Sequence, residues 1–346
     1  MQSFNETKIS NLYLHFVGNQ FHDEPLTLGQ TKLAYNEEVE TDLITYFTSS
    51  FKGNEFFQLH HESDLELNEV YSFASKIFES PEELHSLSVS LAKHLYEQSS
   101  HPKIKGGEFY VAFLEGCILE GEIVDAIGLF KTENKDRFLK IANDENEFMI
   151  DSQEGININK LDKGCIIFNT NKRNGYVLSV LDNTNKGNDA KFWFDDFLHV
   201  KQREDAYYQT ESAMKFAKEF ITKELPEQFE ATKADQADLL NKSAQYFKEQ
   251  EEFDLSEFAN VVIQQPEIIE SFNDYKTSYQ QDRAVAFKES FDINDSAVKK
   301  KASVFKSVIK LDKNFHIYVH GDRTKIEQGT DESGRKFYTL FYDQEN

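Results

Sequence analysis

Residues 165–181 read Cys165-Ile166-Ile167-Phe168-Asn169-Thr170-Asn171-Lys172-Arg173-Asn174-Gly175-Tyr176-Val177-Leu178-Ser179-Val180-Leu181. Two apolar runs, 165–170 and 176–181, are rich in β-branched and aromatic residues and enclose a polar loop that closes on Asn-Gly. Asn-Gly is typical of turns that join antiparallel strands, because both residues tolerate a positive φ. We therefore expect a hairpin here, and with it a sheet of antiparallel strands.

The sequence around this hairpin alternates in the same way. Residues 108–114 and 125–131 are strand candidates, and residues 9–19 read as a strand that ends in a turn. Two helices are expected between them. One carries apolar residues at helical spacing over 70–78, and the other has a stripe of Leu84, Leu87, Leu91 and Leu95. Ser80-Pro81-Glu82-Glu83 is expected to open the second helix as a capping box.

From about residue 206 the pattern becomes helical, and from 303 it returns to strands over 304–311, 315–319 and 336–341. A further capping box is expected where Asp254 is followed by Glu257. The predicted fold class is α+β: a mixed N-terminal region with antiparallel strands, a helical middle and a β-rich basic C-terminal end. We divide the chain into an N-terminal domain, 1–205, and a second domain, 206–346, that is helical and then a β meander.

Charge is distributed unevenly along the 346 residues, which carry a formal net charge of −23. Residues 1–295 hold 28 Lys+Arg against 54 Asp+Glu, whereas residues 296–346 hold 10 against 7. An acidic chain repels phosphate, so the global field argues against simple non-specific DNA binding. The basic surplus lies entirely at the C-terminal end.

No targeting segment or membrane span is expected. The first residues lack the basic and apolar regions of a signal peptide, and no apolar run approaches the roughly 20 residues of a span. The cytoplasm is therefore the expected compartment. Cys117 and Cys165 lie in apolar stretches and are expected to be free, buried thiols.

The sequence predicts no catalytic residue, no cofactor and no metal site. The glycine-rich phosphate loops, the nucleophile elbow and the C-x-x-C motif are missing from the sequence. His316 and His320 have a metal-ligand spacing only on a helix, and the residues between them read as a strand, which would separate them by roughly 13 Å. Asp195-Asp196 is better read as a solvated turn or helix cap than as a catalytic pair.

The C-terminal basic segment offers the most specific functional hypothesis. Lys299-Lys300-Lys301 precedes residues 305–311, where alternation would place Phe305, Ile309 and Leu311 on one face and Lys306 and Lys310 on the other. Such a lysine face could meet phosphates. The alternative is an edge strand whose lysines prevent aggregation. Lys172 and Arg173 at the hairpin tip have the same two interpretations.

Several blocks, in order along most of the chain, resemble the NdpA-type (YejK-type) bacterial nucleoid-associated proteins. They begin at Leu14-His15-Phe16-Val17-Gly18-Asn19, Leu67-Asn68-Glu69-Val70-Tyr71 and Ala92-Lys93-His94-Leu95-Tyr96-Glu97. They continue at His101-Pro102-Lys103-Ile104-Lys105-Gly106-Gly107-Glu108, Ile127-Gly128-Leu129-Phe130-Lys131-Thr132-Glu133-Asn134 and Asp195-Asp196-Phe197-Leu198-His199-Val200. The resemblance implies residence on the bacterial nucleoid, with DNA or DNA-bound proteins as partners. It brings no catalytic residues and does not identify the DNA contacts.

Three hypotheses follow. The first is a non-enzymatic protein that binds double-stranded DNA non-specifically through Lys299, Lys300, Lys301, Lys306, Lys310, Lys172 and Arg173, where a homodimer could double the phosphate contacts. The second is an acidic interaction module that DNA-processing enzymes recruit to the nucleoid. The third, a metal-dependent nuclease, has only scattered carboxylates in its favour.

Overall fold

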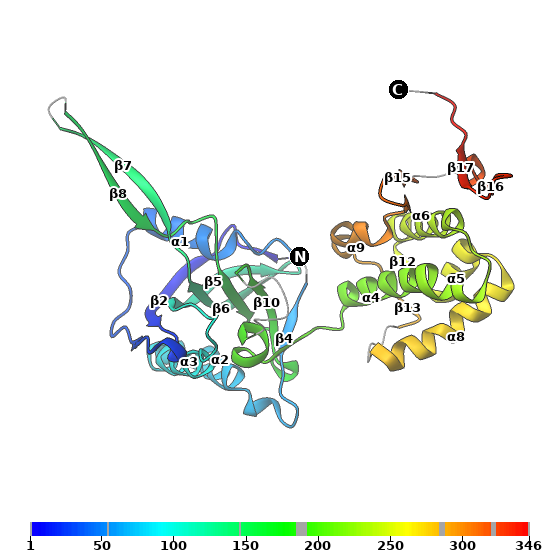
Figure 1. Ribbon diagram of the computed structural model, residues 1–346. Coiled ribbons are helices and arrows are strands. Elements are labelled where there is room, and N and C mark those ends of the chain that lie inside the picture. The colour runs from blue at the N-terminus through cyan, green and yellow to red at the C-terminus, as the bar shows by residue number, and fades with distance from the viewer. Residues whose placement is uncertain are drawn as a thin grey trace. The chain divides into compact units, whose positions relative to one another are not determined.

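The computed structural model describes residues 2–53, 55–144, 147–184, 192–283, 288–319 and 323–344. The chain divides into two compact units, Met1–Arg203 (unit 1) and Glu204–Asn346 (unit 2) (Figure 1). The boundary drawn from the sequence, between residues 205 and 206, lies beside this one. Helices and antiparallel strands are mixed in the chain, so the α+β class is confirmed.

Unit 1 is built on one antiparallel sheet with the strand order β11-β4-β10-β9-β6-β5-β2-β3, and β1 pairs with β5. The strands are β1 (Gln2–Ser3), β2 (Lys8–Val17), β3 (Leu26–Thr27), β4 (Phe57–Leu59), β5 (Gly107–Leu119), β6 (Glu122–Thr132), β9 (Lys163–Phe168), β10 (Val177–Asp182) and β11 (Val200–Gln202). The strands expected over 9–19, 108–114 and 125–131 are confirmed as β2, β5 and β6, and the last two are longer than expected.

The predicted hairpin is confirmed as β9 paired with β10, where Phe168 faces Val177. Its loop is a 3-10 turn, Lys172–Asn174, with Asn171 at φ 58° and Gly175 at φ 88° on either side. A Cβ on Gly175 would lie 2.1 Å from the carbonyl oxygen of Leu59 on the neighbouring strand. Glycine is therefore required at this position by the backbone conformation and by the close approach of β4.

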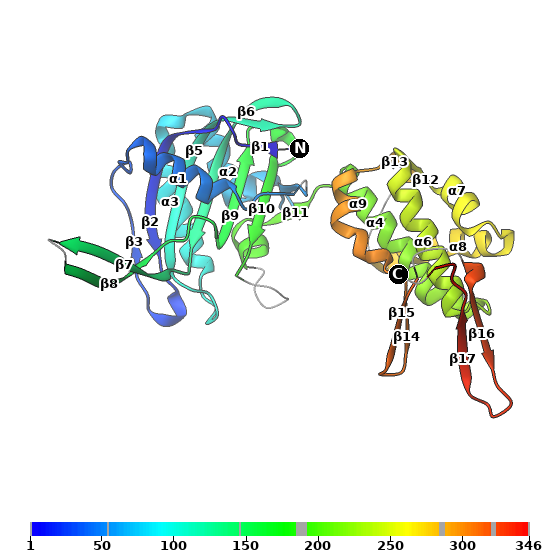
Figure 2. The same cartoon turned by 90° about the horizontal axis from the view of Figure 1, so that it is seen from above.

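Helices cover both faces of this sheet, since successive strand residues point to opposite sides. Phe109, Val111 and Phe113 of β5 join the core beneath α2 (Glu69–Glu79) and α3 (Leu84–Gln98). The residues between them, including Tyr110 and Leu114, join the core beneath α1 (Glu37–Thr48). Figure 2 shows these layers. The sheet is therefore buried on both sides and forms a rigid base for what projects from it.

The two capping boxes expected from sequence do not form. Residues Pro81–Glu83 make a 3-10 turn before α3, and the Ser80 side chain makes no capping hydrogen bond. Asp254 does cap α7 (Leu255–Phe258) by accepting from the Glu257 amide, which is one half of the expected box. A complete capping box occurs instead at α6, between Thr232 and Asp235.

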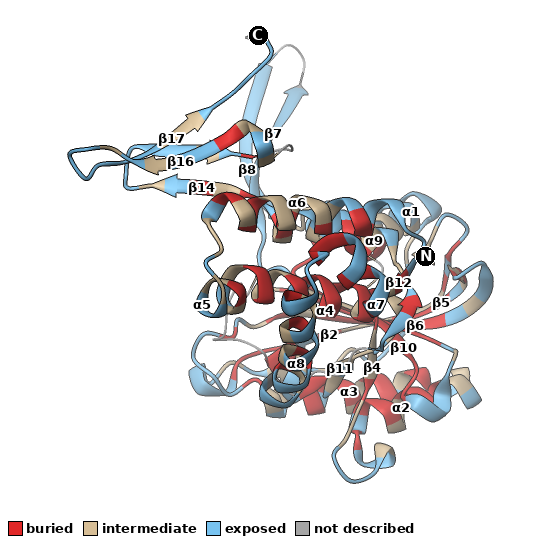
Figure 3. Cartoon of the chain, turned by 90° about the vertical axis from the view of Figure 1, so that its right-hand side faces the viewer, coloured by how far each residue is buried: buried red, intermediate tan, exposed pale blue. Residues whose placement is uncertain are grey.

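One hairpin stands apart from the sheet. Strands β7 (Asp136–Asp144) and β8 (Glu147–Gly155) pair antiparallel with one another, and neither pairs with another strand among the described residues. The hairpin projects from the body of unit 1 (Figures 1 and 2). It is exposed along its length (Figure 3). It is not among the strands expected from the sequence.

Unit 2 is mainly helical, with a core of closely packed aromatic rings that includes Phe216, Phe220, Phe247 and Phe272. Its helices are α4 (Ala206–Glu219), α5 (Leu225–Gln228), α6 (Lys233–Glu249), α7 (Leu255–Phe258), α8 (Pro266–Arg283) and α9 (Asp295–Lys301). Its described strands form three two-stranded antiparallel sheets: β12 (Glu252–Asp254) with β13 (Ser290–Asp292), which are separated in the chain by α7 and α8, and the two hairpins β14 (Val308–Leu311) with β15 (Phe315–Tyr318) and β16 (Ile326–Thr330) with β17 (Lys336–Leu340).

The predicted C-terminal strands need one correction. The strand expected over 304–311 begins only at Val308, because Ala302–Phe305 is a 3-10 turn that buries Phe305 in the helical core. The strands expected over 315–319 and 336–341 are confirmed as β15 and β17. None of the helices in the described part of the chain has the length and apolar character that crossing a bilayer requires.

Candidate nucleic-acid interface

The five C-terminal lysines singled out in the sequence do not share one face. Lys299, Lys300 and Lys301 form the last turn of α9, whose buried residues Ala297 and Val298 fix its orientation. Lys306 follows the 3-10 turn, and Lys310 lies in β14. The single strand assumed over 305–311 was wrong, so the placement of Phe305 and Lys306 by alternation was wrong as well. Ile309 and Lys310 do alternate, with Ile309 buried and Lys310 exposed.

Two of the α9 lysines are engaged within unit 2. The Nζ of Lys301 lies 2.7 Å from Oε1 of Glu211 on α4, and that carboxylate is only 8% exposed. The Nζ of Lys300 lies 5.6 Å from the ring centroid of Tyr207, which is cation–π range. Lys299 is exposed. The triplet therefore contributes to the packing of α9 on α4, in addition to any role toward a ligand.

Lys306 and Lys310 are brought together with a third lysine, Lys233, around a hollow of about 270 Å³. We call this the lysine hollow. Lys233 is the first residue of α6, and the Thr232–Asp235 capping box sets where that helix begins. The lysine hollow is also lined by Gln236, Ala237 and Leu240 of α6 and by Ser307 and Val308.

The charges around the lysine hollow are available to a ligand. Lys233, Lys306 and Lys310 are exposed, and they form no ion pair among the residues that the structure describes. The Nζ of Lys233 donates to Oε1 of Gln236 at 3.0 Å, which orients it without neutralising it. Three ammonium groups around one small depression form a local positive site on an acidic unit.

The outer face of the hairpin β14–β15 continues this surface. Lys310 pairs in register with His316, and Val308 pairs with Tyr318, so these four side chains share one face. His316 is exposed and Tyr318 is 62% exposed. The opposite face is anchored by the buried Ile309, which packs with Val319 and Ile326.

Three other basic residues of the C-terminal end have acidic partners. Arg323 pairs with Asp235 at 2.7 Å, and Arg335 pairs with Asp331 at 2.8 Å. Lys325 pairs with Asp343. Arg323, Lys325 and Arg335 therefore add little unpaired positive charge, whereas Lys306 and Lys310 at the lysine hollow, and Lys299, Lys313 and Lys336 outside it, form no ion pair among the described residues.

Lys172 and Arg173 lie in unit 1, in the 3-10 turn between β9 and β10. The Nζ of Lys172 lies 2.7 Å from Oε1 of Glu79, and this hydrogen bond raises the pKa of Lys172 and lowers the pKa of Glu79. Arg173 is exposed. This pair is a separate, smaller basic feature, half of which already has an acidic partner.

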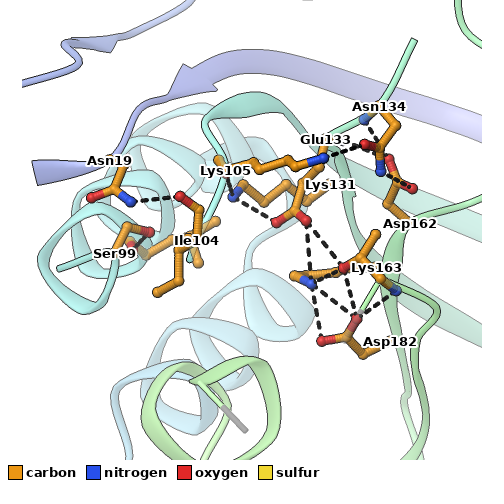
Figure 4. A network of polar contacts seen from close by, with 12 residues as sticks. Asn19, Ser99, Ile104, Lys105, Lys131, Glu133, Asn134, Asp162, Lys163 and Asp182 are labelled. Carbon is orange, nitrogen blue, oxygen red and sulfur yellow. Dashed lines mark hydrogen bonds and ion pairs between the residues drawn. The ribbon is translucent and has the colours of Figure 1, made fainter. Parts of the chain in front are cut away.

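The densest cluster of titratable groups is buried in unit 1 (Figure 4). Lys131 and Lys163 have fully buried side chains, and Glu133 lies between them, 3.0 Å from the first and 3.3 Å from the second. Asp182 also accepts from Lys163 at 2.9 Å. Burial lowers the pKa of Lys131, although the Glu133 carboxylate opposes that shift. Each ammonium meets a carboxylate, so the network holds β6, β9 and β10 together rather than presenting an open site.

The other candidate groups do not converge. His316 is exposed on β15, and His320 lies outside the described residues. Asp195 and Asp196 are exposed in the helical turn Phe192–Phe197. Cys117 and Cys165 are buried free thiols, as predicted. No group of three or more His, Cys, Asp or Glu side chains within the described ranges is placed to hold a metal ion.

Lys233 is the site residue that sequence reasoning missed. It precedes Lys306 by more than seventy positions, and nothing local links the two segments. The available signal was indirect: Thr232 followed by Asp235 marks a helix start, which would have placed Lys233 in an exposed first turn.

The chain was compared with models of known protein families and with curated proteins. Residues 14–333 fit the family model described as nucleoid-associated protein YejK, which covers both units. No curated protein matches the chain.

Proposed function

This chain belongs to the family of nucleoid-associated protein YejK, and from that premise we propose that it binds double-stranded DNA directly, through the lysine hollow of unit 2. The family supports a nucleoid role for the chain. Direct contact with DNA, its location on unit 2 and a cytoplasmic compartment are parts of the proposal.

The observation that carries the proposal is the convergence of Lys233, Lys306 and Lys310 around one depression. Ammonium groups bind backbone phosphates as point charges without reading sequence, so the contact would be non-specific. His316 and Tyr318 on the adjoining face add donors that could reach phosphate or sugar oxygens. Lys299 and Lys313 lie in the same unit and could extend the contact.

The acidic field limits this contact to short range. Unit 1 carries 19 Lys+Arg against 33 Asp+Glu, and unit 2 carries 19 against 28. At physiological ionic strength, charges separated by more than about 8 Å are largely screened, so the nearby lysines dominate what a bound phosphate experiences. DNA affinity should therefore be modest, and it should depend on very few residues.

A matched pair of variants tests the proposal. In the hollow variant, Lys233, Lys306 and Lys310 are all changed to Gln. In the control variant, the exposed or half-exposed Lys93, Lys242 and Lys248, which lie outside the hollow, are changed to Gln, so the net charge falls equally. We expect fluorescence anisotropy with double-stranded DNA to show binding by wild type and control and a loss of at least tenfold in the hollow variant. Equal losses in both variants would contradict a specific role for the hollow.

A second candidate function is supported by the charge of the two units. Both are acidic, and such surfaces complement the basic patches of DNA-processing enzymes, which could recruit the protein to the nucleoid. A pull-down from cells, with and without nuclease, separates the two functions. Partners retained after digestion would favour recruitment by proteins, whereas their complete loss would leave direct DNA binding as the better account.

The proposal assigns no chemical step, no catalytic residue and no cofactor. Incubation of the purified protein with plasmid DNA and Mg²⁺ or Mn²⁺ tests this part separately. We expect the plasmid to remain intact at high protein concentration. Nicking that disappears when an exposed carboxylate is substituted would show that the protein is a nuclease.

A further inference from the structure

The hairpin β7–β8 exposes large apolar side chains on both faces, and most of them lie on one face. In its register Ile141 pairs with Ile150, Leu139 with Ser152 and Asn143 with Phe148, so these six side chains point to the same side. Phe148 is 73% exposed, Leu139 69%, Ile150 68% and Ile141 66%. We call this surface the arm face. Contiguous exposure of four large apolar side chains is a feature of interaction sites rather than of free surfaces.

The arm is held in place at its root. The Oδ2 atom of Asp136 accepts from Nδ2 of Asn157 at 2.8 Å and from Nζ of Lys160 at 3.2 Å. Asp162, which follows the hairpin in the chain, accepts from the amides of Glu133 and Asn134, which precede it, at 2.6 and 2.8 Å. These hydrogen bonds fix the base of the hairpin, which projects away from the sheet. An isolated two-stranded hairpin is marginally stable in water, so the arm itself gains from being covered.

Charge identifies what can cover it. Among the described residues of the hairpin, the ionic groups on the arm face are Arg137 and Glu154, which pair with each other at 2.9 Å. The opposite face carries Phe138 and Met149 among charged residues, with Asp136, Glu147 and Asp151 against Lys140. The acidic opposite face would attract a basic protein and repel a nucleic acid. The arm face has no net charge, so it matches a partner surface that is neutral and apolar like itself.

We propose that the arm face packs against the same face of a second copy of this chain, related by a two-fold axis, and so forms a homodimer. Such a contact is isologous, and each copy contributes the same residues. The four large side chains would bury roughly 500 Å² on each copy, or roughly 1,000 Å² in total, which is the lower limit for a specific interface. The dimer is therefore expected to be reversible, with a dissociation constant in the micromolar range.

The dimer adds to the proposed function without depending on it. Two copies joined through unit 1 carry two lysine hollows, and linking two weak sites raises the apparent affinity for a long DNA without any new contact. Self-association is measured in the absence of DNA. A failure of dimerisation therefore remains distinguishable from a failure of DNA binding.

Sedimentation velocity of the full chain over a range of concentrations tests the dimer. The arm variant carries Ile141→Glu and Ile150→Glu. The control carries Ala142→Glu and Met149→Glu, which place the same two charges on neighbouring positions of the opposite face. Because all four positions lie outside the unit 1 core, both variants should give the circular dichroism spectrum and thermal midpoint of wild type.

We expect a concentration-dependent dimer for wild type and control, and a dissociation constant at least tenfold higher for the arm variant. A wild type that stays monomeric up to about 100 µM would overturn the proposal. Unchanged dimerisation of the arm variant would also overturn it, and equal losses in variant and control would show that the arm face is not the contact.

Discussion

The ammonium of Lys301 lies 2.7 Å from Oε1 of Glu211, which ties the last turn of α9 to α4 across the core of unit 2. The same carboxylate oxygen also accepts from Lys215, 2.5 Å away. Burial on its own would raise the pKa of Glu211, but the hydrogen bonds and charges of the two lysines outweigh it and hold that pKa below its usual value. Lys301 therefore has a structural partner that Lys299, two residues earlier, lacks in the described contacts.

Replacing Lys301 should affect stability more than DNA binding. We expect Lys301→Gln to lower the free energy of unfolding by about 1–2 kcal/mol, since a charge-assisted hydrogen bond to a buried carboxylate is lost. The pKa of Glu211 is lower in the folded chain than in the unfolded chain, so its ionisation stabilises the folded state at any pH above the ordinary pKa of a glutamate. Wild type should lose this stabilisation as the pH falls through the lowered pKa. The variant should lose less, because its Glu211 has one lysine partner fewer. Urea unfolding measures both effects. Lys299→Gln is the control and should change stability by less than about 0.5 kcal/mol.

Substitutions of different residues in the buried network of unit 1 should lower the free energy of unfolding by different amounts. Glu133→Gln removes the carboxylate charge that faces both buried ammonium groups, and among its described hydrogen-bond partners Lys131 then has only neutral oxygens, such as the Lys105 carbonyl at 2.5 Å, so we expect a loss of about 3 kcal/mol. Lys131→Met should cost clearly less, because Glu133 keeps Lys163. Thermal or urea unfolding ranks the two variants. The surface pair Arg137–Glu154 provides the control, and Arg137→Gln should cost less than about 1 kcal/mol. The reverse order of Glu133→Gln and Lys131→Met would contradict this description of the network.

His15 should make unit 1 sensitive to mild acid. Its ring is 2% exposed, accepts at Nδ1 from the Gly29 amide and lies 3.0 Å from Oγ of Ser88 through Nε2. Burial, with a smaller effect of His85, lowers the pKa of His15 to about 4. Between the ordinary pKa of about 6.5 and the lowered value, the unfolded chain binds a proton that the folded chain does not, so stability should fall as the pH falls.

We expect this residue to account for about 3 kcal/mol of the stability lost between pH 7 and pH 4. Urea unfolding of wild type and His15→Gln over that range gives the difference in slope, and NMR titration gives the pKa directly. An unchanged slope together with an imidazole pKa near 6.5 would show that the ring is solvated.

Much of the fold could be predicted from local sequence signals. The β9–β10 hairpin follows from Asn174-Gly175 between two apolar runs, and the stripe of leucines from Leu84 to Leu95 marks α3. The β7–β8 hairpin escaped prediction because its apolar residues, such as Phe138 and Leu139, are adjacent in sequence and exposed on both faces, so no burial period appears. The turn at Ala302–Phe305 escaped prediction because Phe305 is buried by helices, not by a sheet.

The candidate site could be predicted only in part. Lys306 and Lys310 carry a local signal, since both stand beside buried apolar residues in a basic segment. Their convergence with Lys233 depends on how α6 packs against β14, which is a tertiary fact. Conversely, Lys301 looks identical to Lys299 in the sequence, and only the packing of α9 on α4 reveals its partner Glu211.

The salt dependence of DNA binding tests the central claim most directly. Neutralising a phosphate releases counterions, so each contact adds about −0.9 to the slope of log affinity against log salt. Anisotropy titrations of wild type, the hollow variant and the control variant at several salt concentrations give the three slopes. We predict that the slope of the hollow variant is shallower than that of wild type by about 2.7, as expected for three lost phosphate contacts, and that the control keeps the wild-type slope. A wild type that binds no DNA at low salt, or a hollow variant with the wild-type slope, would contradict direct DNA binding through the lysine hollow.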